Sequence, residues 1–135
     1  MIPAVGDALP PFRIALVDPE AMKDWARFLA DPNPIHLDVG VVRAKGLGDR
    51  VINQGPANVA YAMNMLLRAF PGARIEEMDS RFLDNVYGGD AVTAQGEVTA
   101  VEGDRVTCAF TLEVEGRGPV NSGTAVLRLS NPQGD

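Results

Sequence analysis

The chain has 135 residues, of which 46% are apolar and 22% are charged, and it carries a formal net charge of −6. This length and composition predict one soluble globular domain, residues 1–135, with a single core. The negative charge argues against binding to nucleic acid or to an anionic membrane. The single cysteine excludes an intrachain disulfide, and the N-terminus lacks the pattern of a signal peptide, so we expect a cytoplasmic protein. The most apolar segment, 57–70, is too short to span a bilayer.

The first half of the sequence predicts one short strand, at 12–17, followed by three helices. The first helix begins at Asp18 and Pro19, because aspartate accepts hydrogen bonds from free N–H groups and proline fits a first turn. Two later X-Pro pairs must end this helix. A second, short helix extends to about residue 45. The third, 57–70, is apolar nearly all round, which is typical of a buried helix.

The second half of the sequence predicts four strands, at 74–83, 91–101, 105–115 and 121–130. The third strand is the clearest, because apolar and polar residues alternate along it with a period of two. This order of elements predicts an α+β fold, in which an antiparallel meander curves around the buried helix. A single sheet that is covered on one face leaves its edges exposed, which favours a dimer.

The segment Asp31-Pro32-Asn33-Pro34-Ile35-His36 carries the strongest candidate for chemistry. It places a carboxylate and the only histidine of the chain five residues apart. The two prolines restrict the backbone between them. Imidazole and carboxylate can together move protons to and from one water molecule. From the spacing alone, however, the favoured interpretation is a structural turn in which His36 merely packs.

The surrounding segment, 28–38, resembles the signature of the MaoC-like, (R)-specific enoyl-CoA hydratase family. An aromatic residue, Asp, Asn-Pro, an aliphatic residue and His occur in the family's order, with Ala30 where the family usually has glycine. Two further segments resemble the family in sequence order: 50–55, which precedes the central helix, and 81–90, which enters a strand. The resemblance extends over residues 12–130 and favours a catalytic loop over a plain turn.

The resemblance implies the hot-dog fold, a curved antiparallel sheet wrapped around a long central helix, and active sites near a dimer interface. It implies catalysis by Asp31 and His36 and an oxyanion hole that includes the backbone N–H of Gly55. A helix start supports this placement, because it offers free N–H groups to a thioester oxygen. The implied reaction is the reversible addition of water to a trans-2-enoyl-CoA, a lyase reaction of fatty acid metabolism that gives the (R)-3-hydroxyacyl-CoA.

We therefore expect a homodimer that binds an acyl-CoA substrate. Asn33, Gln54, Tyr61 and Asn64 are candidates for substrate contacts, although Asn33 is equally suited to shaping the turn and Tyr61 to the core. No metal is expected, because one histidine and scattered acids do not make a site. No cofactor is expected beyond the CoA of the substrate.

Three other functions stay open. A dehydratase would run the same chemistry backward on an acyl-carrier-protein thioester or a specialised CoA ester. A hot-dog thioesterase would also use a carboxylate and a helix start, but the Asn-Pro-Ile-His segment argues against it. A non-catalytic acyl-CoA-binding partner subunit of a heteromer is the third possibility, and the intact Asp31 and His36 argue against that one.

Overall fold

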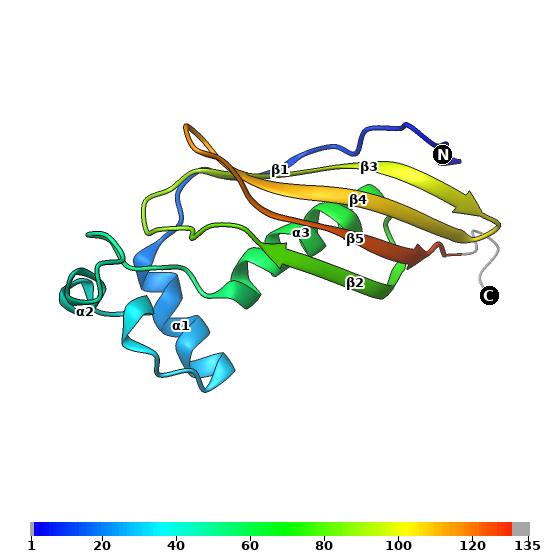
Figure 1. The fold of residues 1–135 in the computed structure, drawn as a ribbon. Coiled ribbons are helices and arrows are strands. Elements are labelled where there is room, and N and C mark those ends of the chain that lie inside the picture. Colours follow the sequence, from blue (N-terminus) through cyan, green and yellow to red (C-terminus); the bar gives the residue numbers. More distant parts are fainter. Residues whose placement is uncertain (1, 131–135) are drawn as a thin grey trace.

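A curved five-stranded antiparallel sheet wraps around one long helix in the computed structural model, which describes residues 2–130 (Figure 1). The strands are β1 (Phe12–Ile14), β2 (Arg74–Phe82), β3 (Val92–Glu102), β4 (Arg105–Val114) and β5 (Gly118–Arg128). The helices are α1 (Pro19–Leu29), the 3-10 turn η1 (Pro34–His36), α2 (Val39–Ala44) and the long helix α3 (Gly55–Ala69). Figure 1 shows α1 and α2 beyond one end of the sheet, at the end where α3 begins.

Helix α1 begins and ends as the sequence predicts. Asp18 is its N-cap, and Oδ1 of Asp18 accepts a hydrogen bond from the N–H of Glu20 at 2.9 Å. After Leu29, Ala30 adopts a left-handed conformation with a φ of 51°. Glycine adopts this conformation without strain, which accounts for the glycine that the family signature usually has here. The left-handed residue turns the chain sharply out of α1 and into the segment that begins with Asp31.

Helix α3 is buried on one side only, whereas the sequence predicts a helix that is buried all round. It also begins two residues earlier than predicted, at Gly55. Met63 and Leu67 lie on its uncovered side and are 37% and 39% exposed. A single sheet can wrap only one side of a helix, so the opposite side has no neighbour within this chain. The buried residues, which face the sheet, are Ala57, Asn58, Ala62, Met65 and Leu66.

The strand order, β1-β3-β4-β5-β2, departs from a simple meander. Strands β3, β4 and β5 follow one another as predicted, but β2 pairs with β5 at the far edge of the sheet. Strand β1 ends at Ile14 and is shorter than predicted. Beyond it, the N–H of Val17 bonds to the carbonyl of Asp90 at 2.8 Å, outside the paired strands. Strand β5 begins at Gly118, three residues before the predicted start at 121, in a glycine- and proline-containing segment whose sequence is typical of a turn.

The core lies between the concave face of the sheet and α3. Strand β4 confirms the predicted alternation, since every second residue from Val106 to Val114 is buried. Cys108 belongs to this set, and its burial raises the pKa of the thiol to about 11. It is a small buried apolar residue, as predicted, and its thiol is protonated at neutral pH.

Gly123 on β5 allows β2 to approach closely. A Cβ at this position would overlap the carbonyl oxygen of Asp79 and lie 2.8 Å from the ring of Phe110. We expect Gly123→Ala to lower the free energy of unfolding, measured with urea, by at least about 2 kcal/mol, because a paired backbone cannot move aside. In the control Gly103→Ala, the added Cβ meets nothing within 4 Å, and the one source of strain is the positive φ of 62°. Its cost is about 1 kcal/mol, and equal costs at the two sites would contradict the explanation.

Candidate active site

The segment between α1 and α2 is held in shape by its own polar side chains. Oδ1 of Asp31 accepts a hydrogen bond from the N–H of Asn33 at 3.1 Å. Oδ1 of Asn33 accepts one from the N–H of Ile35 at 3.3 Å and so caps η1. These local bonds turn the chain at two successive X-Pro pairs. Asn33 therefore has the turn-shaping contact, and a contact with substrate stays a prediction.

The structure brings Asp31 and His36 together. Nε2 of His36 lies 3.5 Å from Oδ2 of Asp31, and the two side chains are 9% and 38% exposed. The imidazole is therefore buried, and the carboxylate is partly exposed to solvent. This separation is longer than a strong direct hydrogen bond. One small molecule at the open side can contact both groups.

A backbone carbonyl fixes the other ring nitrogen of His36. Nδ1 lies 2.6 Å from the carbonyl oxygen of Ile52. Because a carbonyl oxygen only accepts hydrogen bonds, Nδ1 carries the proton in this contact. In the neutral ring, Nε2 then has the free lone pair, and this nitrogen faces Asp31. The contact therefore prepares Nε2 to accept a proton.

The first residue of α3, Gly55, has a free backbone N–H. The N–H groups of Ala57 and Asn58 both bond to the carbonyl of Gln54, at 3.1 and 3.3 Å, and Pro56 has no N–H. Within residues 2–130, the N–H of Gly55 has no acceptor. Gly55 also lies three residues after Ile52, the acceptor of His36. The positive end of the helix dipole therefore lies at a residue whose backbone N–H is free.

Phe82 at the end of β2 packs against Gly55. A Cβ at Gly55 would lie 3.2 Å from the Phe82 ring, which is tighter than ordinary van der Waals contact. Glycine therefore serves two purposes here: it admits the ring of Phe82, and it leaves the backbone N–H open to close approach.

The side chain of Gln54 contacts α1. Its side chain is fully buried, and Nε2 donates to the carbonyl oxygen of Met22 in α1 at 2.8 Å. This contact ties α1 to the start of α3 and gives Gln54 a structural role, and its contact with substrate stays a prediction. Asn64 lies on the exposed side of α3, about 14 Å along the helix axis from Gly55. The structure does not bring Asn64 together with Asp31 and His36.

A buried polar cluster, formed by Asn53, Asn58 and Tyr61, lies at the start of α3. Nδ2 of Asn53 donates to Oδ1 of Asn58 at 2.8 Å and to the hydroxyl oxygen of Tyr61 at 3.1 Å. Burial raises the pKa of Tyr61, and the hydrogen bond from Asn53 partly offsets this rise. The sequence does not single out Asn53 or the role of Asn58. The available signal is an amide on an otherwise apolar helix face, which requires a polar partner if it is buried.

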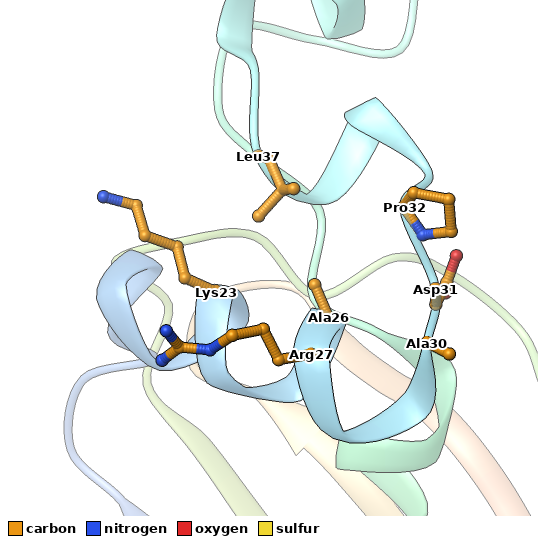
Figure 2. A pocket seen from close by; sticks show the side chains of 7 residues that line it. All are labelled: Lys23, Ala26, Arg27, Ala30, Asp31, Pro32 and Leu37. Atoms are coloured by element: carbon orange, nitrogen blue, oxygen red, sulfur yellow. The ribbon is translucent and has the colours of Figure 1, made fainter.

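An open groove of about 460 Å³ lies beside the dyad. Figure 2 shows Lys23 and Arg27 of α1 on one side of this groove and Asp31 and Pro32 on the other. Lys23 and Arg27 each form an exposed ion pair with an acidic residue on α1, and such pairs are weak. The groove is therefore bordered by cations that can exchange partners, and Asp31 is the member of the dyad that lines it.

No group of three or more His, Cys, Asp or Glu side chains within residues 2–130 is placed to hold a metal ion. None of the helices in this part of the chain is both long enough and apolar enough to cross a membrane.

A curved sheet around one long helix, with an acid and an imidazole near the start of that helix, defines a hot-dog protein with a candidate proton-transfer site. The family model of the MaoC-like domain matches residues 8–116. The chain therefore belongs to the MaoC-like domain family, a family of hydratases and dehydratases. A comparison with curated protein sequences gives no match.

Solved structures agree with this fold. The (R)-hydratase from A. caviae involved in PHA biosynthesis matches with a TM-score of 0.86 and 24% identity, over 94% of this chain and 97% of that one. The ChsH1-ChsH2 complex from Mycobacterium tuberculosis contains a chain that matches with a TM-score of 0.86 and 23% identity, over 96% and 100%. The C-terminally truncated HadBC (3R-hydroxyacyl-ACP dehydratase) complex, from the same organism, contains a chain that matches with a TM-score of 0.71 and 16% identity. The match covers 92% of this chain and 99% of that one. At these identities, the similarity shows the hot-dog fold alone.

Proposed function

We propose that this protein is a hydro-lyase that adds water reversibly to a trans-2-enoyl-CoA and gives the (R)-3-hydroxyacyl-CoA. The observation that carries the proposal is the position of His36 Nε2, 3.5 Å from Oδ2 of Asp31 and held as a base by the Nδ1 contact to Ile52. Membership of the MaoC-like family supports a hydro-lyase as the class of enzyme. The CoA ester and the configuration of the product belong to the proposal.

The proposed mechanism uses one water molecule between Asp31 and His36. The dyad takes one proton from this water as its oxygen attacks Cβ of the enoyl group, and the electron pair of the double bond moves toward the thioester oxygen. The free N–H of Gly55 donates to that oxygen and stabilises the negative charge that develops there. The dyad then returns one proton to Cα, so that the elements of water are added with no net change in the protein.

The substrate contacts are a separate part of the proposal. Lys23 and Arg27 border the groove beside Asp31, and their charge complements the phosphates of CoA. Tyr61 lies on α3 near the free N–H of Gly55, so its half-buried ring stays a candidate for contact with the acyl group. Asn33 and Asn64 have exposed positions, and their contacts with substrate stay predictions.

A dehydratase that uses an acyl-carrier-protein thioester or a specialised CoA ester is the second candidate. The fold of the HadBC complex supports this alternative only at the level of architecture. Because hydration and dehydration share one equilibrium, the two candidates differ in the carrier and not in the role of the dyad.

We expect the purified protein to consume the enoyl absorbance of crotonyl-CoA without release of free thiol, whereas a thioesterase would release thiol. Asp31→Asn and His36→Gln should each lower kcat at least about a hundredfold, because each removes one proton carrier. The amide oxygen of Asn at position 31 can still accept the hydrogen bond from Asn33, so the segment keeps its shape.

Asp38→Asn is the matched control for this experiment. Oδ1 of Asp38 caps α2 by accepting a hydrogen bond from the N–H of Gly40 at 2.8 Å, and asparagine caps equally well. This variant should retain the activity of the wild type. Full activity in Asp31→Asn, or an equal loss in Asp38→Asn, would refute the role of the Asp31 carboxylate.

The homodimer is also a proposal. Phe82 and Leu83, at the end of the edge strand β2, are 55% and 51% exposed, and Met63 and Leu67 are exposed on α3. We call these four residues the apolar face. Large exposed apolar side chains beside an unpaired strand edge are typical of a surface that a second chain covers. Each chain carries both Asp31 and His36. A dimer of two identical copies therefore has both residues of the proposed catalytic dyad without a partner of different sequence.

We expect sedimentation at micromolar concentration to give the mass of two chains. The double variant Met63→Glu/Leu83→Glu should give the mass of one chain, because charges on the apolar face are costly to bury. Val5→Glu changes an exposed apolar residue outside this face and should leave the mass of two chains. A wild-type protein with the mass of one chain would exclude the homodimer.

A further inference from the structure

Asn53 lies between the two parts of the candidate site. It follows Ile52, whose carbonyl accepts from His36, and it precedes Gly55 by two residues. Its side chain is 4% exposed, and Nδ2 donates to Asn58 and to Tyr61. Its backbone N–H donates to the carbonyl of Val86 at 2.7 Å. A buried residue that is held through both its backbone and its side chain is a fixed point of the structure.

The side chain of Asn53 ties the entry of α3 to the helix through two side-chain contacts. Gln54 is the N-cap residue of α3, but its side chain makes no capping hydrogen bond. Asn53 instead bonds to Asn58 in the first turn of α3 and to Tyr61 in the second. These two bonds fix the direction in which the chain enters the helix. They thereby fix the direction of the free N–H of Gly55.

We propose that Asn53 is a positioning residue, which holds the Ile52 carbonyl against Nδ1 of His36 and the Gly55 N–H toward the same site. The inference rests on the proposed function of that site. When the Asn53 amide is removed, the backbone bonds from Asn53 to Val86 and from Ile52 to Ile35 remain, but the segment 52–55 loses its ties to α3, and the acceptor of His36 is held less firmly. The neutral ring then populates both tautomers, so that Nε2 is the base for only part of the time. Catalysis is sensitive to such displacements, because a shift of about 1 Å can cost a hundredfold in rate.

The test uses the full chain and its single histidine. The 15N spectrum of the neutral ring of His36 shows which ring nitrogen carries the proton. We expect the wild type to show the proton on Nδ1. Asn53→Leu removes the amide at similar volume, and we expect it to show mixed tautomers and a kcat for crotonyl-CoA that is at least about tenfold lower. KM should change much less than kcat, because the loss concerns the orientation of reacting groups.

Asn121→Leu is the matched control. Asn121 is also a buried amide, and its Nδ2 donates to Oγ of Ser80 at 3.0 Å on the neighbouring strand. This variant should lower the Tm, because it also removes a buried hydrogen bond. It should leave the ring spectrum of His36 and kcat unchanged. A purely structural Asn53 would behave in the same way as Asn121.

The proposal is overturned if Asn53→Leu has the ring spectrum of the wild type and a kcat within about threefold of it. If Asn53→Leu does not fold, the double variant Asn58→Ala/Tyr61→Phe decides, because it keeps Asn53 and removes both of its acceptors. Mixed tautomers in that variant support the proposal, and an unchanged spectrum overturns it. If the wild type does not hydrate crotonyl-CoA, the proposed function fails, whereas the ring spectrum still tests Asn53 alone.

Discussion

The hydrogen bond from Nδ1 of His36 to the carbonyl of Ile52 joins the two halves of the candidate site. One half is the segment that leaves α1 and carries Asp31, and the other is the start of α3 with the free N–H of Gly55. The bond sets the tautomer of the imidazole and the distance between these halves at once. The amide of Gln54 adds a second connection, from the start of α3 to Met22 in α1. The arrangement thus depends on backbone carbonyls as much as on the reactive side chains.

Features that depend on neighbouring residues could be predicted from the sequence. Asp18 caps α1 where predicted, the segment 31–36 turns as its two prolines require, and the alternation along β4 is confirmed. These signals are local, because capping, proline geometry and the two-residue period of a strand each act over a few residues. The resemblance to a family then gave a chemical meaning to a turn that the spacing alone did not distinguish from a structural one.

Features that depend on distant parts of the chain could not be predicted in the same way. The position of β2 beside β5 is set by how the chain crosses the end of the sheet, and no local pattern encodes it. The hydrogen bond from the Gln54 amide to the carbonyl of Met22 depends on where α1 packs, and the residues beside Gln54 give no sign of it. Asn53 carries no signal by itself, because its importance comes from bonds to Asn58 and Tyr61, which tertiary structure brings within reach. The direction of a side chain at the end of a loop depends on the packing of distant segments, so the local sequence does not predict it.

The proposed mechanism requires one pocket that presents Asp31, His36 and the Gly55 N–H to the same thioester. A crystal structure with an unreactive acyl-CoA thioester analogue would show whether such a pocket exists. We expect the thioester oxygen within about 3 Å of the Gly55 nitrogen, and a water molecule within hydrogen-bond distance of both Nε2 of His36 and Oδ2 of Asp31. A thioester oxygen beyond about 3.5 Å from that nitrogen, or an acyl group bound away from both side chains, would contradict the account.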